Sequence, residues 1–162
     1  MSTQNALFVK MALDAWETYN SRVDKLIAKL SDEQLKAETA PGRNTGIYLL
    51  GHLVAVNDAM LPLLGLGERL HPELEEIFLK SADKTGHEMP AAETLKNYWN
   101  EINTKLRSHF SAMQPEDWFA RHMSVSPEDF EKEPHRNRLN IMLNRTNHQA
   151  YHLGQMVYLG PK

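Results

Sequence analysis

Apolar residues recur at intervals of three and four along four long segments of the chain, which is the pattern of amphipathic α-helices. In the first segment the apolar stripe begins at Phe8 and ends at Leu30. Ser31 and Gln34 follow at the spacing of a capping box, which predicts a short helical turn directly after this helix. The break at Ala40-Pro41-Gly42 then ends the first helical region.

The second predicted helix begins after Asn44 or Thr45, which are both favourable N-cap residues. It ends at Gly65-Leu66-Gly67. Its buried stripe consists of Leu49, His52, Leu53, Val56 and Met60. Residues 68–89 lack sustained periodicity, and we expect them to be irregular apart from one helical turn at 73–79.

The third predicted helix has Pro90 at its first helical position, where the missing N–H costs nothing. Its apolar stripe covers residues 95–113, and Gln114-Pro115 ends the helix. We expect loops over residues 116–136, with one turn opened by Ser126.

The fourth predicted helix begins near Asn137 and is closed by Gly160-Pro161. One face of it carries Ile141, Asn144, His148, Tyr151, His152 and Gln155. No segment of the chain shows sustained period-two alternation, so the pattern predicts an all-α protein. Four amphipathic helices around one core predict a four-helix bundle, in which ligand sites form between facing helices.

The length and the connections refine this fold. A chain of 162 residues has the length of one domain, so we expect a single domain over residues 1–162. The connections after the second and third helices are long for an up-down bundle. We therefore expect a crossover topology.

The composition narrows the classes of function. A formal net charge of −3 gives no attraction to nucleic acid or to an anionic membrane, and we expect neither as a partner. The chain has no Cys, which excludes disulfides and thiolate chemistry by the protein and fits a reducing compartment. The first residues lack the pattern of a signal peptide, and His52, Asn57-Asp58 and Pro62 interrupt the longest apolar runs. We expect a cytoplasmic protein without a membrane span.

Two histidines one helical turn apart, His148 and His152, are the main candidates for chemistry. On a helix, residues i and i+4 have Cβ atoms about 5–6 Å apart, so two such imidazoles can bind one metal ion. His52, in the apolar second helix, is the third candidate. Three imidazoles form a recurrent catalytic zinc site with an open fourth position, and imidazole also suits nickel, copper and iron. The spacing alone leaves open that each is a core histidine bonded to a neighbouring carbonyl.

Four polar residues lie within one turn of these histidines and are candidates for orienting a ligand or contacting a substrate. They are Tyr48, Asn144, Tyr151 and Gln155. Polar packing at the edge of the core explains each of them equally well. Gln149 stands where a His-Glu-x-x-His peptidase has its general base, and it cannot take a proton at neutral pH, so peptidase chemistry of that type is disfavoured.

The combination of Gly51-His52-Leu53 with Asn147-His148 and His152-Leu153-Gly154-Gln155 resembles the DinB-like superfamily of small four-helix bundles. The resemblance implies a divalent metal ion held by His52, His148 and His152, an up-down-down-up helix order and a homodimer. Zinc and nickel are the ions that we expect. Relatives of this kind include metal-dependent hydrolases and enzymes that transfer bacillithiol or mycothiol to electrophiles.

These observations favour a metal-dependent enzyme that activates either water or a small thiol. The sequence offers no strong general base near the three histidines, which slightly favours thiol S-transfer over hydrolysis. The alternatives are a metal-binding stress or interaction module without turnover, and a purely structural bundle. Because ligating histidines must be neutral, we expect metal affinity to fall as the pH drops through roughly 6–6.5.

Overall fold

The computed structural model describes residues 3–160, which form helices and connecting loops without any β-strand. The α-helices are α1 (Thr3–Ile27), α2 (Asp32–Lys36), α3 (Gly46–Asp58), α4 (Met60–Leu63), α5 (Ala92–Ala112), α6 (Pro127–Lys132) and α7 (Arg138–Met156). One turn of π-helix, η1 (Glu76–Lys80), and two of 3₁₀-helix, η2 (Pro115–Phe119) and η3 (Val157–Leu159), complete the order. The prediction of an all-α protein is confirmed.

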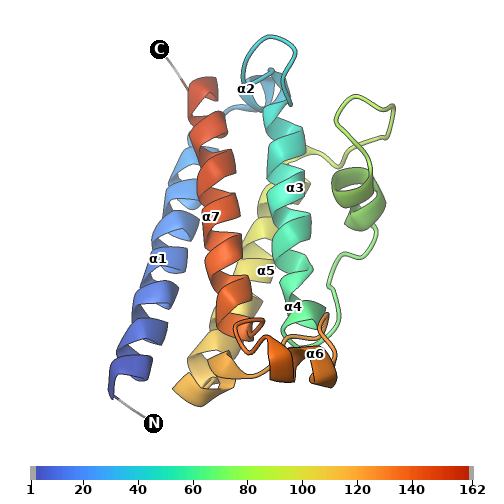
Figure 1. Cartoon of the computed structure of the whole chain (residues 1–162). Coiled ribbons are helices and arrows are strands. Elements are labelled where there is room, and N and C mark those ends of the chain that lie inside the picture. The colour runs from blue at the N-terminus through green and yellow to red at the C-terminus, as the bar shows by residue number, and fades with distance from the viewer. Residues whose placement is uncertain (1–2, 161–162) are drawn as a thin grey trace.

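Four long helices, α1, α3, α5 and α7, lie side by side (Figure 1). Helix α7 packs against both α1 and α3, and α3 packs in turn against α5. Helix α3 is central, because all of its residues except Ile47 and His52 are buried. His52 is therefore a partly buried imidazole on an otherwise buried helix.

Side chains expected to cap the helices do so. Thr45 Oγ1 accepts the backbone N–H of Tyr48 at the start of α3, at 3.3 Å. Asn137 Oδ1 accepts the N–H of Asn140 at the start of α7, at 2.9 Å. Ser31 forms the capping box of α2. Each cap pairs a backbone donor that would otherwise be left free at a helix start.

Two expectations about helix ends are corrected. Helix α5 begins at Ala92 with Ala91 as its N-cap, so Pro90 precedes the helix instead of opening it. The segment after α5, expected to be a loop, begins with η2, because the Asp117 carboxylate accepts the backbone N–H of Gln114 at 2.7 Å and stabilises one turn. Pro161, expected to help close the last helix, lies outside the described residues.

The connection between α4 and α5, expected to be irregular apart from one helical turn at 73–79, forms a helical turn at η1 and packs closely on α3 through it. Phe78 of η1 is completely buried against α3. Gly51 permits this approach, because a Cβ atom on it would lie only 2.2 Å from ring carbons of Phe78. A glycine at this place therefore brings the backbone of η1 next to His52.

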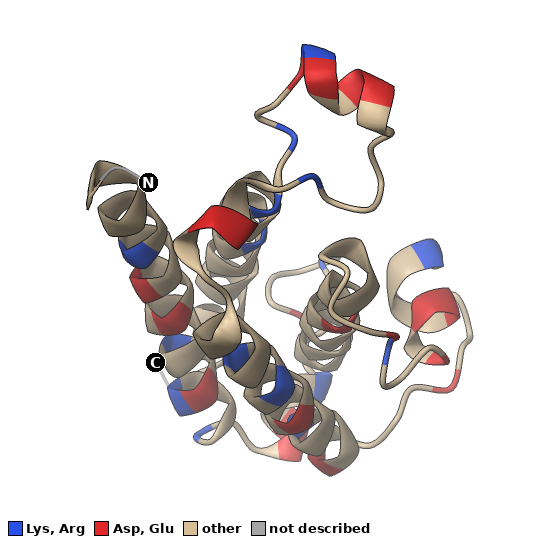
Figure 2. Cartoon of the chain, turned by 90° about the horizontal axis from the view of Figure 1, so that it is seen from below, with Lys and Arg blue, Asp and Glu red and all other residues tan. Residues whose placement is uncertain are grey.

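Helices α1 and α7 differ in their charged residues. Helix α1, which begins near the N-terminus, carries both basic and acidic residues (Figure 2). Helix α7 carries Arg138 and Arg145 and no acidic residue. One stretch, Gly46–Leu63, is long and apolar enough to cross a membrane, but 72% of it is buried inside the structure. Its apolar character is therefore accounted for by its place in the core.

Candidate metal centre

Three imidazoles meet between α3 and α7. His148 Nε2 lies 3.1 Å from His52 Nε2 and 3.0 Å from His152 Nε2. One potential ligand atom from each of the three lies within 4.8 Å of the others. Among the described residues, this is the one group of three or more His, Cys, Asp or Glu side chains arranged closely enough to hold a metal ion.

The outer nitrogens of two of these rings are held by oxygen acceptors. His52 Nδ1–H donates to the carbonyl oxygen of Phe78 at 2.7 Å, and His152 Nδ1–H donates to Gln155 Oε1 at 2.8 Å. A neutral imidazole carries one proton, so both rings present a free lone pair at Nε2 toward His148. Donation of the second ring N–H to a carbonyl or an amide is the arrangement that metal-ligating histidines show.

Hydrogen bonding within the cluster cannot satisfy all three nitrogens. If the proton of His148 is on Nε2, it serves one neighbour and leaves the other facing it without a hydrogen. If the proton is on Nδ1, it has no partner, because that atom is buried and unpaired among the described residues. A metal ion would satisfy all three lone pairs. Two nitrogens about 2.1 Å from one ion are about 3.4 Å apart at a tetrahedral angle, close to the observed separations.

Burial keeps these histidines neutral. Desolvation lowers the pKa of His148 to about 4, and the nearby His152, His52 and Arg145 add to the effect. The pKa values of His52 and His152 are also lowered, chiefly by burial, although the bonds to Phe78 and Gln155 oppose the shift. Neutral imidazole is the form that binds metal, so the site is prepared for a cation at neutral pH.

Two of the four polar candidates, Gln155 and Tyr48, contact histidines of the cluster. Gln155 holds His152 directly, as described above. Tyr48 is buried, its ring is stacked on that of His52 at 6.3 Å between centroids, and its hydroxyl donates to the Ser81 carbonyl at 2.7 Å. Burial and Asp83 raise the pKa of Tyr48, which keeps this hydroxyl protonated.

The other two candidates lie differently. The exposed Asn144 directs its amide to Asn140 Oδ1 at 3.3 Å and not to an imidazole, so it does not orient a ligand here. Tyr151 is 64% exposed, and its ring meets that of His152 edge to face at 5.1 Å. Tyr151 therefore lies on the solvent side of the histidines, where it lines a cavity that opens onto His152.

The segment from Phe78 to Lys84 supports the site and was not identified from the sequence. It provides the carbonyls for His52 and Tyr48, and Asp83 Oδ2 accepts both the backbone N–H and the hydroxyl of Thr45, at 2.7 and 2.9 Å. Backbone carbonyls leave no mark in a sequence. The one available signal was Gly51 beside His52, since a helical glycine can mark the close approach of another chain segment.

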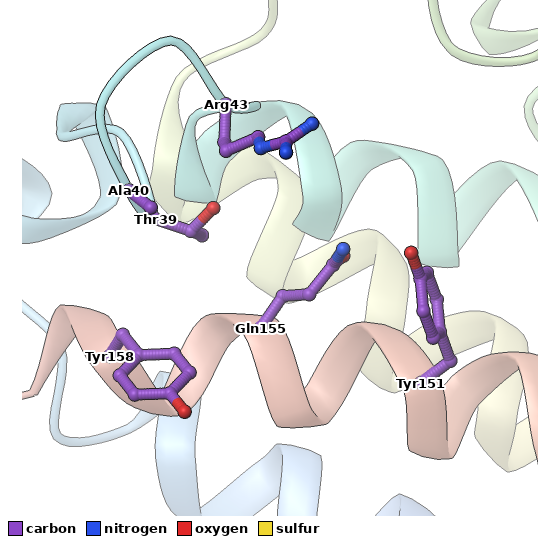
Figure 3. Close-up of a pocket in the computed structure, with 6 residues that line it drawn as sticks. All are labelled: Thr39, Ala40, Arg43, Tyr151, Gln155 and Tyr158. Carbon is purple, nitrogen blue, oxygen red and sulfur yellow. The ribbon is translucent and has the colours of Figure 1, made fainter.

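A cavity of about 270 Å³ opens onto His152. Its lining comes from the loop between α2 and α3 and from one face of α7, and consists of Thr39, Gly42, Arg43, Asn44, Tyr151, His152 and Gln155. A second cavity of about 320 Å³ shares four of these residues and extends to Ala40 and Tyr158. Figure 3 shows Gln155 extending from α7 toward the loop that carries Arg43, with the Tyr151 hydroxyl pointing toward α3.

Comparison with known proteins places this chain in a family. The family model of the DinB superfamily matches residues 15–156. The chain belongs to the DinB superfamily. A crystal structure of a conserved protein from Enterococcus faecalis has the same fold, with a TM-score of 0.64 at 18% sequence identity, over 98% of this chain and 95% of that one. No curated protein matches the chain.

Proposed function

We propose that this DinB-superfamily protein is a metal-dependent enzyme in which His52, His148 and His152 hold one divalent ion through Nε2. The observation that carries the proposal is the meeting of three Nε2 atoms while Phe78 and Gln155 occupy the outer nitrogens of two rings. Three neutral imidazoles leave the ion its full double charge and an open coordination position. Zinc or nickel suits such a set of ligands.

The reaction that we propose is transfer of a small thiol to an electrophile. When bound, a divalent ion supplies the positive charge that favours thiolate over thiol at neutral pH. The sulfur forms a bond to the electrophilic carbon, the leaving group departs with its bonding electrons, and the thiol proton passes to solvent. Because the chain has no Cys, the sulfur belongs to a separate small molecule such as a low-molecular-weight thiol.

The protein's own residues position and shield this chemistry. His52 and His152 are fixed by their Nδ1 bonds, and buried side chains of α3 limit the site on its inner side. Among the described residues, the hydrogen-bond partners of the three imidazoles are a carbonyl, an amide and other imidazoles, and no carboxylate. A thiol is more acidic than water and so needs a general base less, and the absence of a carboxylate among these partners therefore favours S-transfer over hydrolysis.

The finer features of the fold and assembly belong to the same proposal. We propose an up-down-down-up four-helix bundle, in support of which α1 and α7 run toward the end that carries α2 while α3 and α5 run away from it (Figure 1). A homodimer in the cytoplasm is the setting that we propose for the enzyme.

The test is a turnover assay on metal-loaded protein with small thiols and a model electrophile. We expect zinc- or nickel-dependent transfer that the His52→Ala variant loses, while a His109→Ala variant, which removes a histidine of α5 outside the cluster, retains it. Equal rates for wild type and His52→Ala would contradict the catalytic proposal. Metal binding without turnover of any thiol or ester would instead indicate the non-catalytic metal-binding module.

A further inference from the structure

We infer that Arg43 is a specificity residue that binds an acidic group, carboxylate or phosphate, at the far end of the small thiol. The inference deepens the proposed function and rests on it. Arg43 lines both cavities beside the histidines, and His152 lines the nearer one. A molecule with its sulfur at the histidines therefore extends into a space that Arg43 borders.

The charge of this space is one-sided. Among the described residues, the lining of the two cavities has one charged side chain, that of Arg43, with hydroxyl, phenol and amide groups from Thr39, Tyr151 and Gln155 beside it. No Asp or Glu lines either cavity. Helix α7, which forms one wall, has no acidic residue. A cavity of one sign concentrates ligands of the opposite sign.

The nearest acids in this part of the fold are already engaged. The Glu38 carboxylate pairs with Lys84 Nζ and accepts the backbone N–H of Gly42 at 2.7 Å. These bonds lower the pKa of Glu38, so it stays ionised and committed to Lys84 and Gly42. Asp83 accepts the N–H groups of Thr45 and Lys84. No ion pair joins the Arg43 guanidinium to any carboxylate of the described residues, which leaves its planar fork available for an acidic ligand.

Hydrogen bonds of the loop hold the backbone of Arg43 in place before any ligand binds. Arg43 N–H donates to the Ala40 carbonyl at 2.9 Å, and Gly42 has a positive φ of 74°, which with Pro41 forms a type II turn. Lys84 Nζ also donates to the Arg43 carbonyl at 3.0 Å. A preformed turn lowers the ordering cost of binding and so favours recognition through this arginine.

A second cation lies on the inner side of the site. Arg145 is on α7 one turn before His148, and its charge contributes to the lowered pKa values of His52 and His148. Its Nε is buried without a hydrogen-bond partner among the described residues. An anionic ligand would thus be attracted by Arg145 near the histidines and by Arg43 at the lining of the cavity.

The experiment measures thiol binding to the cobalt-loaded protein through the thiolate-to-cobalt charge-transfer absorbance. The probes are ω-mercapto carboxylates of increasing chain length, each with its own uncharged amide, and 2-mercaptoethylphosphonate as the phosphate-like arm. The variants are Arg43→Gln and Arg43→Lys. Arg22→Gln is the matched control, because Arg22 is an exposed arginine of α1 that lines neither cavity. Cobalt content and circular dichroism establish that each variant is folded and loaded.

We expect Arg43→Gln to weaken binding of the best acid about fivefold and to leave its amide unchanged, as expected for one exposed charge-assisted pair. Arg43→Lys should retain part of the preference, and Arg22→Gln all of it. The ion itself attracts acids, so the deciding quantity is the acid-to-amide ratio in wild type against Arg43→Gln. For 2-mercaptoethylphosphonate the same ratio is taken against its uncharged diethyl ester, and the arm with the larger drop identifies carboxylate or phosphate.

The outcomes separate the two proposals. Normal cobalt uptake and a normal thiol band with the same acid-to-amide ratio in wild type and Arg43→Gln would overturn the role of Arg43 alone. Failure of the wild type to take up cobalt, or uptake without a band from any thiol, would overturn the proposed function and this inference with it.

Discussion

Helix α3 carries polar side chains on two sides, and the two clusters differ in how they are satisfied. Toward α5, Asn57 Nδ2 donates to Asn103 Oδ1 and Asn103 Nδ2 donates to the Trp99 carbonyl, both at 2.9 Å. Both asparagines are only 1% exposed. Toward α7, His52 meets His148 and His152 with nitrogen lone pairs converging beside a cavity.

The difference separates a structural polar cluster from a candidate ligand site. In the asparagine cluster each amide nitrogen donates to an oxygen, so the cluster is complete without any further group. In the histidine cluster acceptors face acceptors, which costs free energy unless a cation binds there. Buried polar residues on one helix can therefore be assigned to stability or to binding by counting donors against acceptors.

The largest expected effect is that variants in the two clusters lose different properties: the histidine variant loses zinc affinity, and the asparagine variant loses stability. His148→Ala should lower zinc affinity at least about a hundredfold, since it removes the central ligand, and should leave the metal-free protein folded. Asn103→Ala should keep the affinity for zinc but lose about 1–3 kcal/mol of stability, because Asn57 is left without its acceptor. Equilibrium dialysis with elemental analysis, and urea unfolding of the metal-free proteins, measure the two effects. Loss of zinc from Asn103→Ala alone would reverse the assignment.

Gly51→Ala should affect both stability and metal binding. Its Cβ would lie 2.2 Å from the Phe78 ring, so η1 must move, at a cost of about 1–3 kcal/mol. That movement withdraws the Phe78 carbonyl from His52 and should reduce zinc affinity about tenfold. Thermal unfolding and competitive zinc titration provide the readouts.

Gly154→Ala is the matched control for that variant. Apart from its chain neighbours and the backbone of its own helix, no atom of the described residues lies within 4 Å of a Cβ placed at Gly154, and a helical Gly→Ala change without a clash stabilises by about 0.5–1 kcal/mol. Zinc affinity should not change. If the two variants behaved alike, Phe78 would have no part in orienting His52.

Gln155→Ala should give a smaller effect confined to the histidine side. Loss of the acceptor for His152 Nδ1–H should weaken zinc binding about tenfold with little change in unfolding free energy. Asn144→Ala, on the same face of α7 one turn before His148, should leave zinc affinity unchanged, because Asn144 contacts Asn140 and not an imidazole. Equal losses in both variants would argue against a specific support by Gln155.

The smallest expected effect is on the pH profile. Burial lowers the pKa of all three histidines, that of His148 to about 4, so they remain neutral below the ordinary value of about 6.5. The fall of zinc affinity on acidification should therefore lie at a lower pH than the roughly 6–6.5 expected from unperturbed histidines. A steep fall already between pH 7 and pH 6, measured by titration against a chelator, would contradict the burial of these rings.

The sequence predicted what depends on periodicity and spacing. The helical stripes placed His52 in one helix and His148 and His152 in another, and the caps at Thr45 and Asn137 fixed where those helices begin. An i, i+4 pair must share one face of a helix, so half of the cluster follows from local geometry alone. Its meeting with His52 required only that the two apolar faces pack together.

The sequence could not predict the parts that depend on backbone groups and loop geometry. The carbonyl of Phe78 acts through an atom that every residue possesses, in a segment without periodicity. Arg43 is one exposed arginine among several until the turn at Gly42 places it beside α7. Asn144 shares a helix face with the histidines by spacing, yet its side chain bonds to Asn140, because rotamers and neighbours decide such contacts.

The most direct test of the central claim is anomalous diffraction from crystals of the zinc-loaded protein. We expect one strong anomalous peak for zinc per chain, about 2.0–2.1 Å from the Nε2 atoms of His52, His148 and His152, with a non-protein ligand in a further coordination position. Absence of a peak among these rings at full zinc loading, or a peak bound to other side chains, would contradict it.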